Sequence, residues 1–230
     1  MGLNHLACIM DGNRRWAKKQ GLLPWLGHKN GLDAIERVIN FCLHKKIPYL
    51  SLYTFSIENL QRSHQEQSYL FEVLARQAFQ RIQEFKDRGV AYSFIGDRTL
   101  FPSSVRSLCE NIENETKDGM ALQVYFFFCY GGQQEIVDST KRIALEVFQG
   151  ILQPSDITAT LFKQFLWTKN NCPPDLIIRT GKQQRLSNFL LFQCAYSELY
   201  FLDCMWPDIT IQELEKALIY YDKCQRNFGK

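Results

Sequence analysis

Near its start the chain carries the stretch His5-Leu6-Ala7-Cys8-Ile9-Met10-Asp11-Gly12-Asn13-Arg14-Arg15-Trp16-Ala17. Its first six residues form a short, mostly apolar run, which is typical of a buried strand. Asp11 and Gly12 then favour a tight turn into a helix. A strand, a turn and a helix in this order indicate an α/β protein.

The same alternation of short apolar runs and longer amphipathic stretches continues along the whole chain. The expected strands are residues 5–10, 48–55, 90–95, 122–128, 175–178 and 199–202. The expected helices are residues 30–44, 65–88, 102–117, 132–148, 155–167 and 211–224. Parallel neighbours need crossover connections of this kind, so the order predicts a mainly parallel sheet of about six strands flanked by helices. Because no linker, charge block or repeat divides the chain, we expect one domain over residues 1–230.

Composition and charge exclude several classes of protein. Of the 230 residues 46% are hydrophobic and the net charge is +3, which excludes an intrinsically disordered chain. The near-neutral charge also argues against a dedicated nucleic-acid binder, so we expect no nucleic-acid partner, and a small RNA-binding module is the weakest alternative. No apolar run approaches the ~20 residues of a membrane span, and the start lacks the layout of a signal peptide.

The eight cysteines contain no C-x-x-C pair, so they predict neither a zinc knuckle nor a thioredoxin-type redox site. Most lie in apolar strings such as Leu6-Ala7-Cys8-Ile9, where a thiol behaves as a small hydrophobic group. Buried free thiols are typical of a cytoplasmic protein. We therefore expect a cytoplasmic location, with peripheral contact at a membrane surface left open.

In open parallel sheets ligands bind outside the carboxyl ends of the strands, so the residues after each strand are the candidates for a site. After the first strand, Asp11 and Gly12 are compatible with an ordinary N-capped helix. Arg14 and Arg15, however, oppose the helix dipole unless an anion sits above the helix end. A carboxylate beside that anion needs a bridging cation, and Asp11 with Mg²⁺ and a phosphate meets this need. The residues leave both interpretations open.

Two further segments place polar and basic side chains at the same expected edge of the sheet. The second strand is followed by Ser56-Ile57-Glu58-Asn59-Leu60-Gln61-Arg62. The fifth is followed by Arg179-Thr180-Gly181-Lys182-Gln183-Gln184-Arg185-Leu186-Ser187-Asn188. Ser56 is also a candidate helix cap, whereas the two arginines and the serine of the second segment form a candidate anion site. Taken alone, Glu198 and His28 are more typical of solvent-facing residues.

Together these segments resemble the cis-prenyltransferase family, and the resemblance covers almost the whole chain in the family's order. The motifs that carry it are the quoted stretch from His5 to Ala17, Tyr53-Thr54-Phe55-Ser56-Ile57-Glu58-Asn59, Tyr130-Gly131-Gly132, Asp175-Leu176-Ile177-Ile178-Arg179-Thr180-Gly181, Arg185-Leu186-Ser187-Asn188-Phe189-Leu190-Leu191 and Tyr196-Ser197-Glu198-Leu199-Tyr200. Each motif alone is a weak signal, and their combination is highly specific.

The resemblance implies a homodimeric α/β fold with an apolar tunnel. In this family isopentenyl diphosphate is added to an allylic diphosphate, such as farnesyl or geranyl diphosphate, and each new double bond is cis. The implied product is a long-chain polyprenyl diphosphate, undecaprenyl diphosphate for a cell-wall lipid carrier, released by transient contact with a membrane surface. Strand alternation is expected to send Phe127 or its neighbours into the tunnel.

The resemblance also implies roles for single residues. Asp11 would hold Mg²⁺ and help the allylic diphosphate ionise, and Glu198 would contribute to Mg²⁺ binding from the partner site. Asn59 would help to remove the condensation proton, although an amide is a poor base and the released diphosphate is an alternative acceptor. The allylic diphosphate would be bound by Gly12, Asn13, Arg14, Arg15 and His28. Isopentenyl diphosphate would be bound by Arg179, Arg185 and Ser187. The other substrate-binding candidates are Trp16, Ser56, Ile57, Glu58, Leu60, Arg62 and Leu186.

Several residues depart from the family pattern. The departures are Pro24 in place of an arginine, Leu60 in place of a tryptophan, Lys182-Gln183-Gln184 in place of a Gly-Glu-His type segment, and Cys129 and Gln133 in place of an asparagine and an arginine. Because Asp11 is retained, we expect an active enzyme with altered substrate handling. The alternatives are a non-catalytic partner subunit of the same fold and a nucleotide-phosphate enzyme, such as a phosphatase or phosphotransferase.

Overall fold

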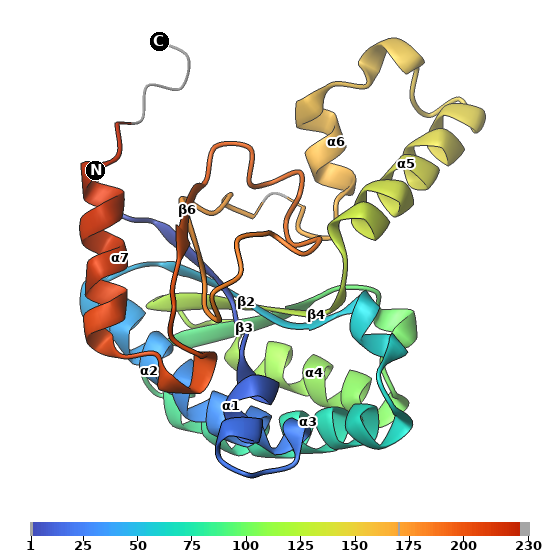
Figure 1. The fold of residues 1–230 in the computed structure, drawn as a ribbon. Coiled ribbons are helices and arrows are strands. Elements are labelled where there is room, and N and C mark those ends of the chain that lie inside the picture. The colour runs from blue at the N-terminus through green and yellow to red at the C-terminus, as the bar shows by residue number, and fades with distance from the viewer. Residues whose placement is uncertain (1, 170, 226–230) are drawn as a thin grey trace.

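Six parallel strands form one sheet in the order β3-β4-β2-β1-β5-β6 (Figure 1). The computed structural model describes residues 2–169 and 171–225, apart from the side chains of residues 72–80, 82 and 83. The strands are β1 (His5–Ile9), β2 (Tyr49–Ser56), β3 (Val90–Ile95), β4 (Leu122–Tyr130), β5 (Leu176–Arg179) and β6 (Glu198–Phe201). The predicted α/β class and parallel sheet are confirmed.

Helices connect the strands from β1 to β5, an irregular loop connects β5 to β6, and helices lie on both sides of the sheet. They are α1 (Asn13–Lys19), α2 (Gly27–Lys45), α3 (His64–Lys86), α4 (Ser103–Thr116), α5 (Gly132–Phe148), α6 (Ala159–Phe165) and α7 (Ile211–Lys223). Short 3₁₀ turns are η1 (Pro24–Leu26), η2 (Ile57–Gln61), η3 (Arg98–Leu100), η4 (Pro154–Asp156) and η5 (Trp206–Asp208). In Figure 1, α2, α3 and α4 cover one face of the sheet, and α5 and α6 project from the opposite side.

Strand alternation divides the core between these two faces. On β4, Phe126 and Phe128 pack toward the face covered by α2, α3 and α4, within clusters that also contain Tyr92 and Phe55. Phe127 points to the other face, where it packs among residues that include Phe189. Of the residues expected to face a tunnel, Phe126 and Phe128 therefore lie on the face covered by α2, α3 and α4, and Phe127 lies on the other face.

The helix ends follow local capping chemistry. Ser63 accepts a hydrogen bond from the backbone N–H of Glu66 and begins α3, one residue before the predicted start. The helix predicted over residues 155–167 is shorter, because the 3₁₀ turn η4 occupies its start and Thr158 caps α6 through the N–H of Leu161. Neither difference moves a strand or a residue of the predicted site.

The cysteines and the helices agree with most of what composition predicts. All eight cysteines are free thiols; Cys8, Cys42, Cys109 and Cys129 are buried and the other four are half-buried. The prediction of buried thiols is thus correct for half of them. Within the described residues, no helix combines the length and the apolar character needed to cross a membrane.

Candidate active site

The carboxyl ends of β2, β1 and β5 are adjacent in the sheet, so the loops that follow them meet at one edge. A cavity of about 970 Å³ lies there, which we call the edge cavity. Of the residues predicted for the site, those that line it are Asp11, Asn13, His28, Ser56, Asn59, Arg62, Arg179, Arg185 and Ser187. The topology therefore brings together three segments that are far apart in the sequence.

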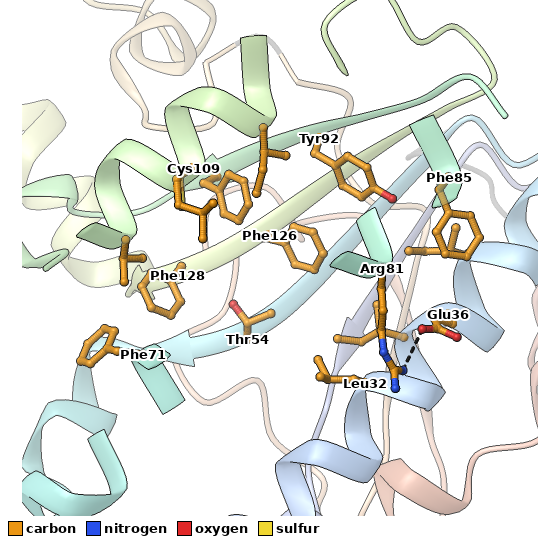
Figure 2. A pocket seen from close by; sticks show the side chains of 16 residues that line it. Leu32, Glu36, Thr54, Phe71, Arg81, Phe85, Tyr92, Cys109, Phe126 and Phe128 are labelled. Atoms are coloured by element: carbon orange, nitrogen blue, oxygen red, sulfur yellow. Dashed lines mark ion pairs between the residues drawn. The ribbon is translucent and has the colours of Figure 1, made fainter. Parts of the chain in front are cut away.

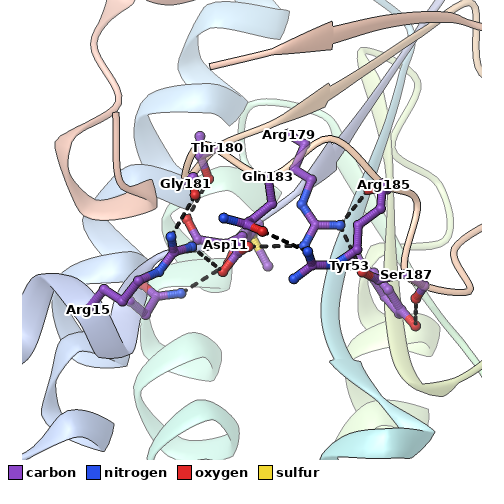
Figure 3. A network of polar contacts seen from close by, with 11 residues as sticks. Asp11, Arg15, Tyr53, Arg179, Thr180, Gly181, Gln183, Arg185 and Ser187 are labelled. Carbon is purple, nitrogen blue, oxygen red and sulfur yellow. Dashed lines mark hydrogen bonds and ion pairs between the residues drawn. The ribbon is translucent and has the colours of Figure 1, made fainter. Parts of the chain in front are cut away.

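Asp11 lies between two guanidinium groups (Figure 3). Its Oδ1 is 3.0 Å from a terminal nitrogen of Arg15 and its Oδ2 is 3.0 Å from one of Arg179. Its backbone oxygen accepts a hydrogen bond of 2.7 Å from the Thr180 hydroxyl. The N-cap of α1 is Gly12 and no side chain caps the helix, so the interpretation of Asp11 as an ordinary helix cap is wrong. The carboxylate is instead directed into the edge cavity.

Gly12 provides the backbone conformation that this placement needs. Its φ is +113°, a left-handed value that side chains disfavour. A Cβ atom at this position would lie 2.8 Å from the Met205 sulfur. Only glycine therefore permits the turn that directs Asp11 toward the cavity and starts α1.

Arg179 organises the loop that follows β5. Its side chain is only 5% exposed, and besides Asp11 it donates to the Ser187 hydroxyl at 2.8 Å and to the Arg185 backbone oxygen. Arg185 in turn donates to Gln183 at 2.6 Å, while Ser187 holds a left-handed backbone at φ +50°. Arg179 is thus largely occupied by protein groups, whereas Arg185 and Ser187 face the cavity from a loop that Arg179 fixes.

A second charged group lies on the α2 and α3 side of the edge cavity. Glu66, in the first turn of α3, is buried, and its Oε1 lies 3.3 Å from Arg62 and 3.5 Å from Arg14. Sequence reasoning missed Glu66, because no local pattern distinguishes it from other acidic residues in a first helical turn. The carboxylate holds two predicted anion-binding arginines in place across three elements.

His28 belongs to this same group. Burial, and then the positive charges of Arg62 and Arg14, lower the pKa of His28 to about 3. Its Nε2 atom is buried and has no hydrogen-bond partner among the described residues. A neutral imidazole beside two guanidinium groups at a cavity wall is suited to an anionic ligand, which would supply the missing partner and favour protonation.

Asn59 and Ser56 form a capping box at η2, so both interpretations of Ser56 apply: it caps a helix and it lines the edge cavity. The backbone N–H of Ser56 donates to Asn59 Oδ1 at 3.3 Å. This contact uses the amide oxygen, and an amide is a poor base in any case. The geometry therefore favours a role in positioning over one in accepting the condensation proton.

The other candidates lie outside the lining of the edge cavity. They are Gly12, Arg14, Arg15, Trp16, Ile57, Glu58, Leu60, Leu186 and Glu198. Trp16 donates to Asp208 at 2.7 Å, Glu58 accepts from Asn188 at 2.7 Å, and Leu60 packs against a hydrophobic cluster. Glu198 begins β6, and its register with Leu176 places it at the amino end of the sheet, away from Asp11 of the same chain.

A metal ion at Asp11 fits this donor set only with help from a ligand. Among the described residues no group of three or more His, Cys, Asp or Glu side chains is arranged to hold a metal. Each carboxylate oxygen of Asp11 accepts one guanidinium contact, which leaves lone pairs free. Mg²⁺ typically binds one or two carboxylates together with substrate phosphates and water, so one aspartate beside a bound phosphate is sufficient.

A second, apolar cavity of about 790 Å³ lies next to the edge cavity. The two have Leu32, Ile35 and Thr54 in common in their linings, so they are adjacent. The apolar cavity lies between the sheet and α2, α3 and α4, and Figure 2 shows Phe71, Phe126 and Phe128 around it. It is the candidate for the apolar tunnel that the sequence resemblance implies.

Comparison with known proteins decides the family. The family model for undecaprenyl diphosphate synthase matches residues 9–229. A farnesyl-diphosphate-specific ditrans,polycis-undecaprenyl-diphosphate synthase of Legionella pneumophila is 40% identical over 226 residues, which are 98% of this chain and 95% of that protein. The chain belongs to the undecaprenyl diphosphate synthase family. The predicted cis-prenyltransferase resemblance is therefore confirmed.

Solved structures of this family share the fold. Lavandulyl diphosphate synthase of Lavandula x intermedia, in complex with dimethylallyl diphosphate, has a TM-score of 0.94 at 32% identity and covers 99% of this chain and 98% of its own. A probable undecaprenyl diphosphate synthase of Campylobacter jejuni has a TM-score of 0.82 at 31% identity, and both chains are covered completely, at 100%. The family therefore includes members whose names state different products.

Proposed function

We propose that this protein elongates an allylic diphosphate with isopentenyl diphosphate, so that each new double bond is cis. The observation that carries the proposal is the position of a polar, arginine-lined edge cavity directly beside an apolar cavity. The first is suited to diphosphates and the second to a growing hydrocarbon chain. A nucleotide-phosphate enzyme would need no such apolar space, and a non-catalytic subunit would not need Asp11.

The reaction breaks the allylic C–O bond and releases diphosphate. The allylic carbon forms a C–C bond with the terminal alkene carbon of isopentenyl diphosphate, and one proton leaves so that a new double bond forms. Positive groups stabilise the negative charge that develops on the leaving diphosphate. Arg62, Arg185 and the N-terminal turn of α1 face the cavity in which this charge develops.

Asp11 is assigned to the allylic diphosphate and Arg185 with Ser187 to isopentenyl diphosphate. The two groups line the same cavity on neighbouring strands β1 and β5, so the two substrates would lie side by side. When bound at Asp11, Mg²⁺ would supply charge neutralisation to the leaving diphosphate. The departing diphosphate is the best acceptor for the proton, because Asn59 is neutral and Asp11 is held by two arginines.

We also propose that the protein acts as a homodimer in the cytoplasm. On α5, Val137, Leu145 and Phe148 are 52%, 55% and 88% exposed, and their spacing places them on one face of the helix. An exposed apolar stripe on a projecting helix pair is typical of an interface. The partner would bring its own Glu198 to complete the metal site. An undecaprenyl-class product, used for a cell-wall lipid carrier, would be released by transient contact of the protein with a membrane surface.

An assay with three arms tests the elongation proposal. The purified protein is incubated with Mg²⁺ and labelled isopentenyl diphosphate plus dimethylallyl, geranyl or farnesyl diphosphate, and the products are resolved by chain length. Parallel samples contain EDTA, or ATP and a phosphomonoester in place of the prenyl substrates. We expect elongation from at least one starter, abolished by EDTA, and no phosphate release from the other substrates. Hydrolysis of ATP or phosphomonoester without elongation would contradict the proposal.

A further inference from the structure

The connection between α1 and α2 exposes two adjacent leucines at the surface. Leu22 and Leu23 are 41% and 55% exposed, and they lie in the turn that joins the two helices, just before η1. We call residues 18–26 the leucine turn. Figure 1 places this turn at the lower edge of the molecule, at the opposite end from α5 and α6. It is therefore separate from the surface that we assign to the homodimer.

Basic residues surround the leucine turn with no acidic residue among them. Residues 12–32 contain five Lys or Arg and no Asp or Glu, although the rest of the chain has a slight acidic excess. The two arginines of this segment form ion pairs beside the edge cavity. The three lysines, Lys18, Lys19 and Lys29, are exposed and form no ion pair within the part of the chain that the structure describes. Their positive charge is therefore free to attract an anionic surface.

The backbone of the leucine turn satisfies much of its own hydrogen bonding. The N–H of Gly21 donates to the Lys18 oxygen at 3.1 Å, and the N–H of Leu22 donates to the Ala17 oxygen at 2.9 Å. With Gly21 at φ +69°, this is the Schellman pattern that ends many helices. Pro24 has no N–H that needs a partner. A turn with few free backbone donors enters the boundary of a bilayer at a low desolvation cost.

Other exposed apolar residues lie beside acidic side chains. Ile211 and Ile219 on α7 are 43% and 52% exposed, almost the same fractions as the two leucines. That helix, however, carries three acidic residues and two lysines, so its charges nearly cancel. An anionic headgroup is attracted by the lysines of the leucine turn and gains little at α7. The combination of exposed leucines and unopposed lysines therefore distinguishes the leucine turn.

The leucine turn is also close to the edge cavity. Asn13 begins α1, His28 lies in the first turn of α2, and both line that cavity. Helix α1 has seven residues, so at a rise of ~1.5 Å per residue its far end lies about 10 Å beyond the cavity. A surface bound to the leucine turn therefore lies near the place that we assign to the diphosphates.

We propose that the leucine turn is a membrane-binding surface, which inserts Leu22 and Leu23 into the boundary of a bilayer while its lysines contact anionic lipid headgroups. Lysines near a bilayer are attracted by its negative surface potential, and exposed apolar side chains add to the binding when they leave water. The proposal gives a location to the membrane contact proposed above and rests on that contact. It does not depend on the chemistry in the edge cavity.

A double leucine variant tests the apolar part of the surface. Leu22→Gln with Leu23→Gln removes the apolar contact and keeps the lysines. Ile211→Gln with Ile219→Gln is the matched control, because it changes two apolar residues of nearly equal exposure on α7. Thermal unfolding of the variants verifies that they fold.

A double lysine variant tests the charge. Lys18→Gln with Lys19→Gln removes two positive charges and keeps the leucines. Lys45→Gln with Lys46→Gln is the matched control, since these are also adjacent, exposed lysines at the end of a helix, at the far end of α2 from the leucine turn.

Binding is measured by co-sedimentation of the full chain with vesicles. The vesicles contain phosphatidylcholine alone, or phosphatidylcholine and phosphatidylglycerol in equal amounts. We expect the wild-type protein to bind the anionic vesicles in preference to the neutral ones. We expect each variant of the leucine turn to bind the anionic vesicles about tenfold more weakly, and each control to remain within about twofold of wild type.

The outcomes separate this surface from the elongation activity. Equal binding of wild type and the leucine variant, or equal binding of wild type to neutral and anionic vesicles, would overturn the proposal. No vesicle binding by wild type would overturn it together with the proposed membrane contact, and would leave elongation standing. A wild-type protein that binds vesicles but forms no product in the elongation assay would overturn the elongation proposal and leave the leucine turn standing.

Discussion

At the scale of single residues, the proposed chemistry depends most on Asp11 at the edge of the sheet. Its carboxylate is held by Arg15 and Arg179 at 3.0 Å each, so its position is fixed before any substrate binds. The carboxylate and its two guanidinium partners therefore form a preorganised charged group, to which we assign the proposed binding of Mg²⁺ and diphosphate.

Asp11→Asn tests this assignment with little change in shape. The amide keeps one hydrogen-bond acceptor but removes the charge that Arg179 and Mg²⁺ require. We expect the turnover number to fall on the order of 100-fold or more, because transition-state charge stabilisation is lost. The control is Asp156→Asn in the remote turn η4, which should keep wild-type turnover. Equal turnover in Asp11→Asn and wild type would remove Asp11 from its role.

His28 makes stability depend on pH. Its pKa is about 3 in the folded protein and near 6.5 when unfolded, so the unfolded state binds the proton more tightly. The contribution of neutral His28 to the free energy of unfolding is therefore fully present above pH 6.5 and is lost as the pH falls toward 3. We expect His28→Gln to flatten the dependence of the free energy of unfolding on pH between about 6.5 and 4.

This prediction is measured by urea unfolding at a series of pH values. His5, whose pKa burial lowers to about 4, contributes in the same direction to both proteins, so the comparison of slopes isolates His28. Parallel pH profiles for wild type and His28→Gln would contradict the lowered pKa.

At the scale of elements, turns between strands and helices fix the cavity walls. Gly96 follows β3 with φ +152°, and a Cβ atom there would lie 1.8 Å from the Phe128 backbone oxygen. This close approach holds the start of η3 against β4, directly beside one of the phenylalanines that line the apolar cavity. The turn is thus part of the support of the cavity.

Gly96→Ala should therefore destabilise the protein by about 2 kcal/mol or more, because the backbone of β4 has to shift. Gly21→Ala is the matched control: its φ is also positive, at +69°, but nothing lies within 4 Å of the added atom. We expect it to cost about 1–2 kcal/mol from conformation alone. Chemical denaturation measures both, and equal losses for the two variants would rule out the steric contact.

Part of this arrangement can be predicted from the sequence. The order of strands and helices, which brings Asp11, Ser56 and Arg179 together, follows from apolar periodicity and the rule for parallel sheets. Sequence patterns do not predict the left-handed backbone of Ser187 and Asn188 or the buried contact of Glu66 with Arg62. They depend on contacts between segments far apart in the chain, and no local propensity encodes such contacts.

At the scale of the whole molecule, the two cavities and the projecting helices have separate proposed roles. We assign the diphosphates to the edge cavity and the growing chain to the apolar cavity. Helices α5 and α6 project from the opposite side of the sheet from α2, α3 and α4 (Figure 1). The exposed apolar residues of α5 line neither cavity, and we assign them to the proposed homodimer interface.

Phe148→Glu places a charge at the end of that stripe, on the most exposed of its three residues. We expect the variant to sediment as a monomer while wild type sediments as a dimer, because an unpaired carboxylate in an apolar interface is strongly disfavoured. Met120→Glu is the control, since Met120 is 93% exposed but lies outside α5 and α6. A wild-type monomer, or a dimer that Phe148→Glu leaves intact, would contradict the assignment of this surface.

The stereochemistry of a single addition tests the account most directly. The wild-type protein is given one equivalent each of allylic and isopentenyl diphosphate with Mg²⁺, and the isolated product is characterised by mass spectrometry and NMR. We expect a product one isoprene unit longer than the starter, with a cis geometry at the new double bond. A trans double bond, or an unchanged starter, would contradict it.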